Sequence, residues 1–265
     1  MEPRVRRLVH KVSSPQQLFP IAAQTFSDIT KEAIARSGRM IVALAGGSTP
    51  RALYELMANE PYRLMIDWKN LFIFWGDERH VPPDHQDSNY RMAHDSLLSK
   101  VPVVPDRVHR MHGELEDAGE AAERYEQVLR EVCSGSEKEV PRFDLILLGM
   151  GPDGHTASLF PGTEAVHESS RWVVAPWVEK FQTSRVTMTP VVLNHARHIL
   201  FLVSGKDKAP ALEAVLEGPS LPDEYPSQVI APKSGGVTWL VDENAASLLK
   251  TTVFHAYEPV DYRDE

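Results

Sequence analysis

The sequence predicts an α/β fold with an open, mostly parallel sheet and helices on both of its faces. Two observations lead to this prediction. Short apolar runs, typical of buried strands, alternate along the chain with segments whose apolar residues recur at helical spacing. Several of the apolar runs end in glycine and polar residues, as strands of an open α/β sheet do where they meet a ligand.

The apolar runs define the expected strands. Each is short and bounded by turn-forming residues. In chain order the predicted strands cover residues 5–10, 40–45, 71–75, 108–111, 145–148, 171–175, 185–189, 198–203 and 237–241. Because helical segments separate most of these runs, neighbouring strands are expected to be parallel.

The helices are predicted from spacing and from the signals at their ends. Ser13 and Ser14, followed by Pro15, start the first helix, and Gly38 ends it. Further helices are expected after residue 50, after the capping residues 87–89, over 118–132, at 190–194, over 207–216 and from Asp242 onward. Residues 134–139 have the composition of a surface loop.

Length and composition are those of an ordinary globular protein. The 265 residues are expected to form a single domain, 1–265, with 42% hydrophobic and 25% charged residues. The net charge of -9 argues against a nucleic-acid-binding surface. We expect no signal peptide and no membrane span. Cys133 is the single cysteine, which indicates a reducing, cytoplasmic location.

The run from Phe143 to Gly162 carries the clearest candidates for chemistry. Its buried strand breaks into glycines, which let the backbone turn sharply and approach a ligand. Asp153 and His155 lie inside this break, where an open α/β sheet binds ligands. An isolated Asp-Gly-His sequence is equally compatible with a tight turn that holds a solvated Asp and a capping His.

A second strand end offers groups for a phosphate. Gly46 and Gly47 leave the backbone amides sterically open. Ser48 and Thr49 add hydroxyl donors at the start of a helix, whose N-terminus carries positive potential. From this stretch alone, phosphate binding and ordinary helix capping by Ser or Thr are equally compatible with the sequence.

Charged residues follow two further strands. Asp77, Glu78 and Arg79 stand at the third strand end, although an internal ion-pair cluster explains them as well. Residues 204–206 end a fourth strand, and Arg185 begins a fifth. Because parallel strands end at the same edge of a sheet, we expect these groups to share one crevice.

Four segments together resemble the 6-phosphogluconolactonase family. They are Gly46–Pro50, Asp77–Pro82 with Ser88–Tyr90, Gly149–Gly162 and Arg185–Thr189. They occur in the family's order, and the resemblance covers nearly the whole chain. It implies a Rossmann-like, glucosamine-6-phosphate deaminase-like fold. It also implies hydrolysis of 6-phospho-D-glucono-1,5-lactone to 6-phospho-D-gluconate, the second step of the oxidative pentose phosphate pathway.

The related glucosamine-6-phosphate deaminases share the glycine-rich loop and the Asp-Gly-His core. After that His they typically continue as Ile-Ala-Phe-Asn-Glu-Pro-Gly, whereas this chain has Thr156–Gly162 and lacks the acidic residue. Arg79 stands where the deaminase usually has an aromatic residue. Both departures favour the lactonase over an isomerising deaminase. A non-catalytic sugar-phosphate sensor is a further alternative, but it would not need both Asp153 and His155.

The resemblance implies roles for individual residues. A neutral imidazole is a suitable base for activating water, so His155 is the expected base, and Asp153 orients it or contacts substrate. The oxyanion is expected to meet either the amides around Gly151 to His155 or Arg79, and Arg79 is alternatively expected at the phosphate. The expected phosphate ligands are Gly46, Gly47, Ser48, Thr49, Arg185 and Lys206. The family has one lysine in this stretch, and Lys208 is the alternative to Lys206 for that role.

The sequence predicts no metal and no cofactor. His109 with His112, and His195 with His198, have the spacing of two metal ligands but no known zinc pattern around them, so we interpret them as solvated. No Gly-x-Ser-x-Gly segment occurs, which argues against a serine hydrolase. The expected partner is a small phosphosugar lactone, without nucleic acid or membrane, and the chain is expected to be a monomer or a weak homodimer.

Overall fold

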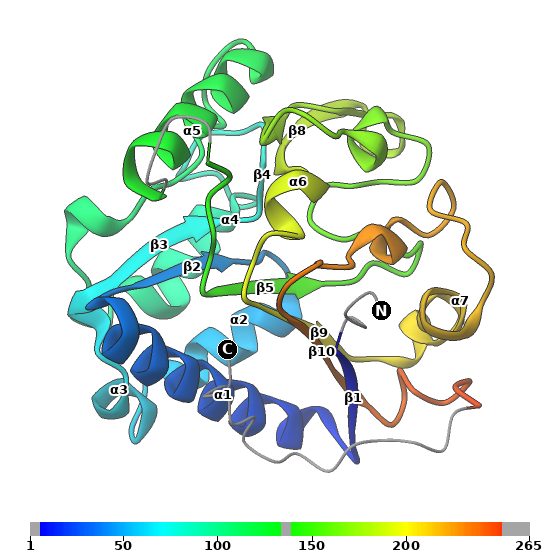
Figure 1. Cartoon of the computed structure of the whole chain (residues 1–265), viewed down its shortest axis with the longest axis horizontal. Helices are drawn as coiled ribbons and strands as arrows, with labels where there is room; N and C mark the ends of the chain where they lie inside the picture. Colours follow the sequence, from blue (N-terminus) through cyan, green and yellow to red (C-terminus); the bar gives the residue numbers. More distant parts are fainter. Residues whose placement is uncertain (1–5, 134–138, 251–265) are drawn as a thin grey trace.

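The structure is a computed structural model that describes residues 6–133 and 139–250. Its centre is a fully parallel sheet of six strands (Figure 1). In the order in which they pair, the strands are β1 (Arg6–Val12), β10 (Gly236–Asp242), β9 (His198–Val203), β5 (Leu145–Gly149), β2 (Met40–Leu44) and β3 (Leu71–Trp75). The predicted parallel α/β sheet is confirmed.

A smaller antiparallel sheet follows β3. β4 (Asp77–Arg79) pairs with β8 (Thr183–Met188), which also pairs with β6 (Val173–Val174) and with β7 (Trp177–Val178). The strand predicted at 185–189 therefore lies in this second sheet, and Arg185 does not stand at the edge of the parallel one. Of the strand predicted at 171–175, only the two residues of β6 pair.

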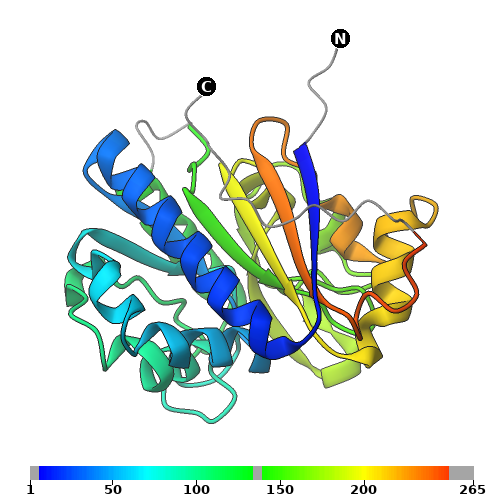
Figure 2. The same ribbon diagram turned by 90° about the horizontal axis from the view of Figure 1, so that it is seen from below.

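Helices cover both faces of the parallel sheet, as predicted (Figures 1 and 2). α1 (Pro15–Ser37) runs diagonally across one face together with α2 (Ser48–Met57), and α5 (Ala118–Cys133) covers the other. The remaining helices are α3 (Tyr62–Met65), α4 (Asn89–Ala93), which continues as a π-helical turn over His94–Leu98, α6 (Pro190–Leu193) and α7 (Ala209–Glu217). Single 3-10 turns cover Trp68–Asn70, Pro105–Arg107, Glu164–His167, Glu179–Phe181, Lys206–Lys208 and Pro226–Val229.

The central strand β5 shows why both faces carry helices. Leu145 and Leu147 pack into an apolar core with residues of α1 and α2, whereas Ile146 and Leu148 pack with residues of α5. All four side chains are buried. Successive side chains of a strand point to opposite faces, so a continuous apolar run needs an apolar partner on each side.

Three predicted elements differ from the structure. Residues 108–111 form no strand, because only Val108 makes an isolated bridge, to Ile73. Asp242 ends β10 and is followed by turns in place of the predicted helix. Its carboxylate accepts hydrogen bonds from Ala245 N (2.7 Å), as a helix cap would, and from Ser204 Oγ (2.6 Å), which ties it to the loop after β9. Residues 134–138 of the predicted surface loop lie outside the described part of the chain.

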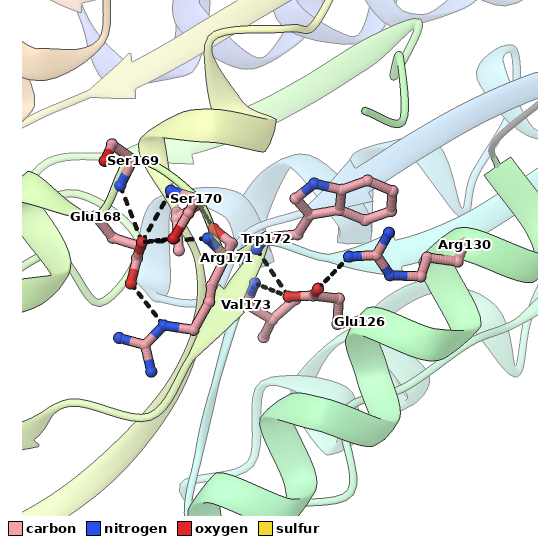
Figure 3. A network of polar contacts seen from close by, with 9 residues as sticks. Glu126, Arg130, Glu168, Ser169, Ser170, Arg171, Trp172 and Val173 are labelled. Atoms are coloured by element: carbon pink, nitrogen blue, oxygen red, sulfur yellow. Dashed lines mark hydrogen bonds and ion pairs between the residues drawn. The ribbon is translucent and has the colours of Figure 1, made fainter. Parts of the chain in front are cut away.

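Two glutamates fasten the segment that leads into β6 (Figure 3). Glu126 of α5 accepts hydrogen bonds from Trp172 N (2.8 Å) and Val173 N (3.1 Å), and it pairs with Arg130. Glu168 accepts the backbone N–H groups of residues 169–171. The two carboxylates thus satisfy backbone donors that would otherwise lose hydrogen bonds on folding.

Glu168→Gln is expected to remove an acid-sensitive contribution to stability. Desolvation raises the pKa of Glu168, but hydrogen bonds from residues 170 and 171 outweigh it and lower the pKa to about 2. A lowered pKa in the folded state stabilises the protein above the ordinary value of 4.5, and this contribution is lost as the pH falls toward 2. Urea titrations over this range should show a shallower loss of unfolding free energy in the variant. The exposed Glu164→Gln is the control, and identical slopes in all three proteins would contradict the prediction.

Candidate active site

A cavity of about 230 Å³ opens at the carboxyl edge of the parallel sheet. Residues that end or follow four neighbouring strands, β9, β5, β2 and β3, form its wall. They are residues 45–50, Gly76, Asp77, Arg79, Asn89, 147–152, His155, Ala157, Leu202, Ser204 and Lys208. Most of the groups predicted to share a crevice therefore meet here, at the edge where open α/β sheets bind ligands.

The loop after β2 presents the start of α2 to the cavity. Gly47 precedes the helix with a φ of 102°, a conformation that favours glycine. Within the part of the chain that the structure describes, no side chain caps α2, so Ser48 and Thr49 are not N-caps. Ordinary capping was one of two interpretations of this stretch. The first N–H groups of α2 therefore have no side-chain cap, and residues 46–50 line the cavity.

Asp153 and His155 form a hydrogen-bonded pair at the cavity. Asp153 Oδ1 lies 2.5 Å from His155 Nδ1, and Asp153 Oδ2 lies 3.0 Å from Lys180 Nζ. Desolvation raises the pKa of Asp153, but His155 and Lys180 outweigh it and hold the pKa well below its usual range. The ionised carboxylate orients the imidazole through Nδ1, which leaves Nε2 as the ring nitrogen for chemistry.

Gly151 makes room for this pair. A Cβ on residue 151 would lie 2.1 Å from His155 Nδ1 and 2.6 Å from Asp153 Oδ1. The amide of Gly151 also donates to His155 O (2.9 Å), which closes the turn. The imidazole stacks on Phe160, with 4.1 Å between ring centres. The backbone of residue 151 and the ring of Phe160 thus restrict where the imidazole can lie.

Glu78 organises the backbone around the site. This carboxylate is 2% exposed and accepts the N–H groups of Arg79, Asn89 and Tyr90 at 2.6–2.8 Å. Burial raises its pKa, although the hydrogen bonds oppose the shift. Over residues 6–133 and 139–250, neither Asp77 nor Glu78 forms an ion pair with the side chain of Arg79. An internal ion-pair cluster, the alternative for this segment, therefore does not describe it.

Arg79 and Arg185 lie directly opposite each other in the antiparallel β4–β8 pair. Opposed residues of such a pair point to the same side of the sheet, so two cations stand close together. Burial lowers the pKa of Arg185, and the charge of Arg79 adds to this effect. Arg79 lines the cavity, whereas Arg185 does not. The guanidinium carbon of Arg185, Cζ, lies 5.1 Å from the ring centre of Phe181. Two adjacent guanidinium groups favour a phosphate as ligand.

The chain matches the family described as glucosamine-6-phosphate isomerases/6-phosphogluconolactonase over residues 13–239. It is 38% identical over 250 residues to 6-phosphogluconolactonase from Synechocystis sp., which covers 94% of this chain and 100% of that protein. The chain belongs to this family. The 6-phosphogluconolactonase from Trypanosoma cruzi has a TM-score of 0.82 at 32% identity over 94% of this chain and 99% of its own. A monomeric glucosamine-6-phosphate deaminase reaches 0.76 at 26% identity over 91% and 99%. The predicted Rossmann-like, deaminase-like fold is confirmed.

In this member of the 6-phosphogluconolactonase family, the loop after β9 brings Lys208 to the cavity. Its side chain is 23% exposed and pairs with Asp207 at 3.0 Å. Lys206, the lysine predicted as a phosphate ligand, is exposed and does not line the cavity. The sequence left both Lys206 and Lys208 as candidates for this role, and in the structure Lys208 lines the candidate site.

Two polar residues near the chemistry were not predicted as site residues. Asn89, which belongs to the predicted helix cap and to the family segment Ser88–Tyr90 but was given no role, lines the cavity. It packs so closely on Gly46 that a Cβ there would lie 1.9 Å from Asn89 Oδ1. Lys180 reaches Asp153 from 27 positions further along the chain. The signal that could have found Asn89 is its place in the family segment Ser88–Tyr90. Lys180 has no signal in a single sequence, because its contact with Asp153 joins distant segments.

The histidines with metal-like spacing were predicted to be solvated, and for two of them this is wrong. His109 stacks on Phe74 at 4.7 Å, and burial lowers its pKa. Burial, with nearby arginines, lowers the pKa of His198 to about 4. Among the residues described, no group of three or more His, Cys, Asp or Glu side chains is placed to hold a metal ion. Within the same residues, none of the helices has the length and apolar character needed to cross a bilayer.

Proposed function

We propose that this chain hydrolyses 6-phospho-D-glucono-1,5-lactone to 6-phospho-D-gluconate, the second step of the oxidative pentose phosphate pathway. The observation that carries the proposal is the Asp153–His155 pair at a cavity on the carboxyl edge of the sheet. The family match and the similarity to proteins named 6-phosphogluconolactonase support it. The chain is thus a carboxylic-ester hydrolase with a phosphosugar lactone as substrate.

His155 acts as general base toward a water molecule. The water oxygen bonds to the lactone carbonyl carbon while a water proton passes to His155 Nε2, and the carbonyl oxygen becomes an oxyanion. When this intermediate collapses, the bond from the carbonyl carbon to the ring oxygen breaks, and the imidazolium returns the proton to that oxygen. Asp153, which is ionised, stabilises the imidazolium between the two steps.

Arg79 is the proposed donor to the oxyanion. The sequence offered a second candidate, the amides of residues 151–155. Three of these amides already donate within the turn, from Gly151 to His155 O, from Gly154 to Gly151 O, and from His155 to Asp153 Oδ1. Arg79 lines the cavity and makes no ion pair among the described residues. Its Nη1 donates to Asp87 O, which leaves its other N–H groups and its charge for the oxyanion.

The phosphate end lies at the start of α2. Gly46, Gly47, Ser48 and Thr49 supply amide and hydroxyl donors there, and all four line the cavity. Lys208 adds positive charge from the cavity wall, and Arg185 adds it from the position opposite Arg79 in the β4–β8 pair. These groups give the substrate a fixed orientation, with its phosphate on the glycine-rich loop and its lactone carbonyl toward His155.

A coupled assay tests the proposal. Lactone is generated in situ, and the appearance of 6-phosphogluconate is compared with the spontaneous rate, because δ-lactones hydrolyse unaided. Ammonia release from glucosamine 6-phosphate is measured in parallel, since the fold is shared with a deaminase. Ammonia release without lactone hydrolysis favours the deaminase. Saturable binding of 6-phosphogluconate without either activity favours a sugar-phosphate sensor.

Arg185→Ala is expected to raise KM by about 2- to 5-fold with little change in kcat, because Arg185 does not line the cavity and acts on the phosphate through its charge beside Arg79. Steady-state kinetics in the coupled assay measure both constants. The exposed Arg124→Ala on α5 is the matched control and should retain both. A normal KM with a collapsed kcat would remove Arg185 from the phosphate end.

Lys208→Ala is expected to raise KM by about tenfold, and Lys206→Ala by less than about twofold, because Lys208 alone of the two lines the cavity. The two variants are controls for each other, since they remove the same side chain within one turn. KM is measured at low and high salt. A larger effect from Lys206→Ala would restore the assignment made from the sequence.

We also propose that the chain acts in the cytoplasm as one domain, 1–265, and as a monomer or weak homodimer. Burial raises the pKa of the Cys133 thiol to about 12, so this cysteine is protonated and unreactive at neutral pH. An unreactive single thiol suits a reducing compartment. Cell fractionation and sedimentation at several protein concentrations test the location and the oligomeric state.

A further inference from the structure

We propose that Lys180 is a positioning residue for the reaction, which holds the Asp153 carboxylate so that its other oxygen meets His155. This inference rests on the proposed function. Each oxygen of Asp153 has its own nitrogen partner, Oδ1 with His155 Nδ1 at 2.5 Å and Oδ2 with Lys180 Nζ at 3.0 Å. A carboxylate held at both oxygens cannot rotate away from the imidazole without losing one of the two contacts.

A hairpin holds the backbone at Lys180. β7 and β8 pair through Trp177 with Ser184 and through Val178 with Thr183, and the 3-10 turn Glu179–Phe181 connects them. Gln182 adopts a φ of 50°, and its side chain donates to the backbone and carboxylate oxygens of Glu179. The turn is thus hydrogen-bonded within itself, which places Lys180 although 56% of its side chain is exposed.

The same turn contacts the imidazole through two aromatic rings. Phe181 packs edge-on against Phe160, with 5.6 Å between centres and 77° between planes. Phe160 in turn stacks on His155. One short turn therefore supports the carboxylate through Lys180 and the imidazole through Phe181. Lys180 does not line the proposed substrate cavity and lies with Asp153 on a neighbouring one. Its effect on the reaction must therefore pass through Asp153.

Lys180 also offsets part of the charge that Asp153 presents to His155. Several other charged groups surround the pair: Arg79 and Lys208 on the substrate cavity, Arg185 beside Phe181, and Glu164 and Glu179 on the neighbouring cavity. Among the described residues, Lys180 is the only one of these cations that pairs with Asp153. Removing its charge makes protonation of the imidazole easier, so the base is lost at a higher pH.

Lys180→Met keeps the length of the side chain and removes the charge. We expect kcat to fall about 3- to 10-fold with KM within about twofold, because the oriented pair is loosened while the substrate contacts remain. The acid limb of the kcat/KM profile should move upward by roughly 0.2–0.7 pH unit. Lys180→Arg should restore kcat and the pH profile, since it returns a cation to Asp153.

Lys31→Met is the matched control. Lys31 lies on α1, is 58% exposed, and pairs with Asp28 at 3.6 Å, so it is a comparably exposed paired lysine far from the site. Its removal should leave kcat and the pH profile unchanged. A Lys180→Met enzyme with the wild-type acid limb would overturn the proposal, as would a change in KM alone or a failure of Lys180→Arg to rescue. Absence of lactone hydrolysis in the wild type would instead refute the proposed function.

Discussion

His155→Ala is expected to lower kcat for the lactone by about 10²- to 10⁴-fold, the range that a positioned general base contributes. The fold and the affinity for 6-phosphogluconate should be retained, because the hydrogen-bond and ring partners of the imidazole among the described residues are Asp153 and Phe160, while the proposed phosphate ligands lie on the loop after β2. The rate is measured in the coupled assay after subtraction of the spontaneous hydrolysis. Calorimetry with 6-phosphogluconate measures product binding.

His112→Ala is the control for this experiment. His112 is 44% exposed and pairs with Glu114 at 3.1 Å, and it does not line the cavity. This variant should hydrolyse the lactone at the wild-type rate. Unchanged turnover in His155→Ala would exclude His155 as the base, and loss of product binding together with turnover would indicate that the residue serves binding instead.

Gly151→Ala is expected to lower kcat by about 100-fold, because a displacement of roughly 1 Å in a reacting group can have an effect of this size. The added methyl group would overlap His155 Nδ1 and Asp153 Oδ1, so at least one of these side chains has to move. KM should change less than kcat, since the phosphate end lies on a different loop. Steady-state kinetics measure both constants, and circular dichroism checks the fold.

Gly149→Ala separates the loss of glycine from the displacement of the pair. Gly149 lines the same cavity, but a Cβ there would meet no atom within 4 Å. We therefore expect a smaller loss of kcat than in Gly151→Ala, and an unchanged imidazole signal of His155 in the NMR spectrum. Equal losses in both variants would show that the turn needs glycine for a reason other than the space that the pair occupies.

The sequence predicts the parallel sheet and the strand ends well, because each follows from local chemistry. Leu145–Leu148 is apolar on both sides, and the glycines after it leave room for a turn. The proposed base and its carboxylate lie two positions apart, so a short turn is enough to bring them together. The predicted residues from Gly46 to Thr49 also line the cavity, since they directly follow β2.

The parts that could not be predicted depend on pairing between distant segments. Arg185 lies in an antiparallel sheet because β8 pairs with β4. The local sequence of β8 does not predict which strand it pairs with. Lys180 meets Asp153 only because the β7–β8 hairpin folds back toward the cavity. Lys206 and Lys208 lie on one 3-10 turn, and the turn exposes the side chain of Lys206 more than that of Lys208. The spacing of the two lysines in the sequence does not predict which of them faces the cavity.

The order of strands in the parallel sheet has a consequence for how the protein is made. Every residue that lines the cavity lies between positions 45 and 208, whereas β1 pairs with β10, at opposite ends of the described chain. During synthesis the first strand therefore emerges long before its partner. The β2, β3, β5 and β9 segments can associate before β10, the partner strand of β1, has been synthesised. We expect the edge strand to join last, after the candidate active site has formed, and β1 to be the part of the sheet that a chaperone meets unpaired on the ribosome.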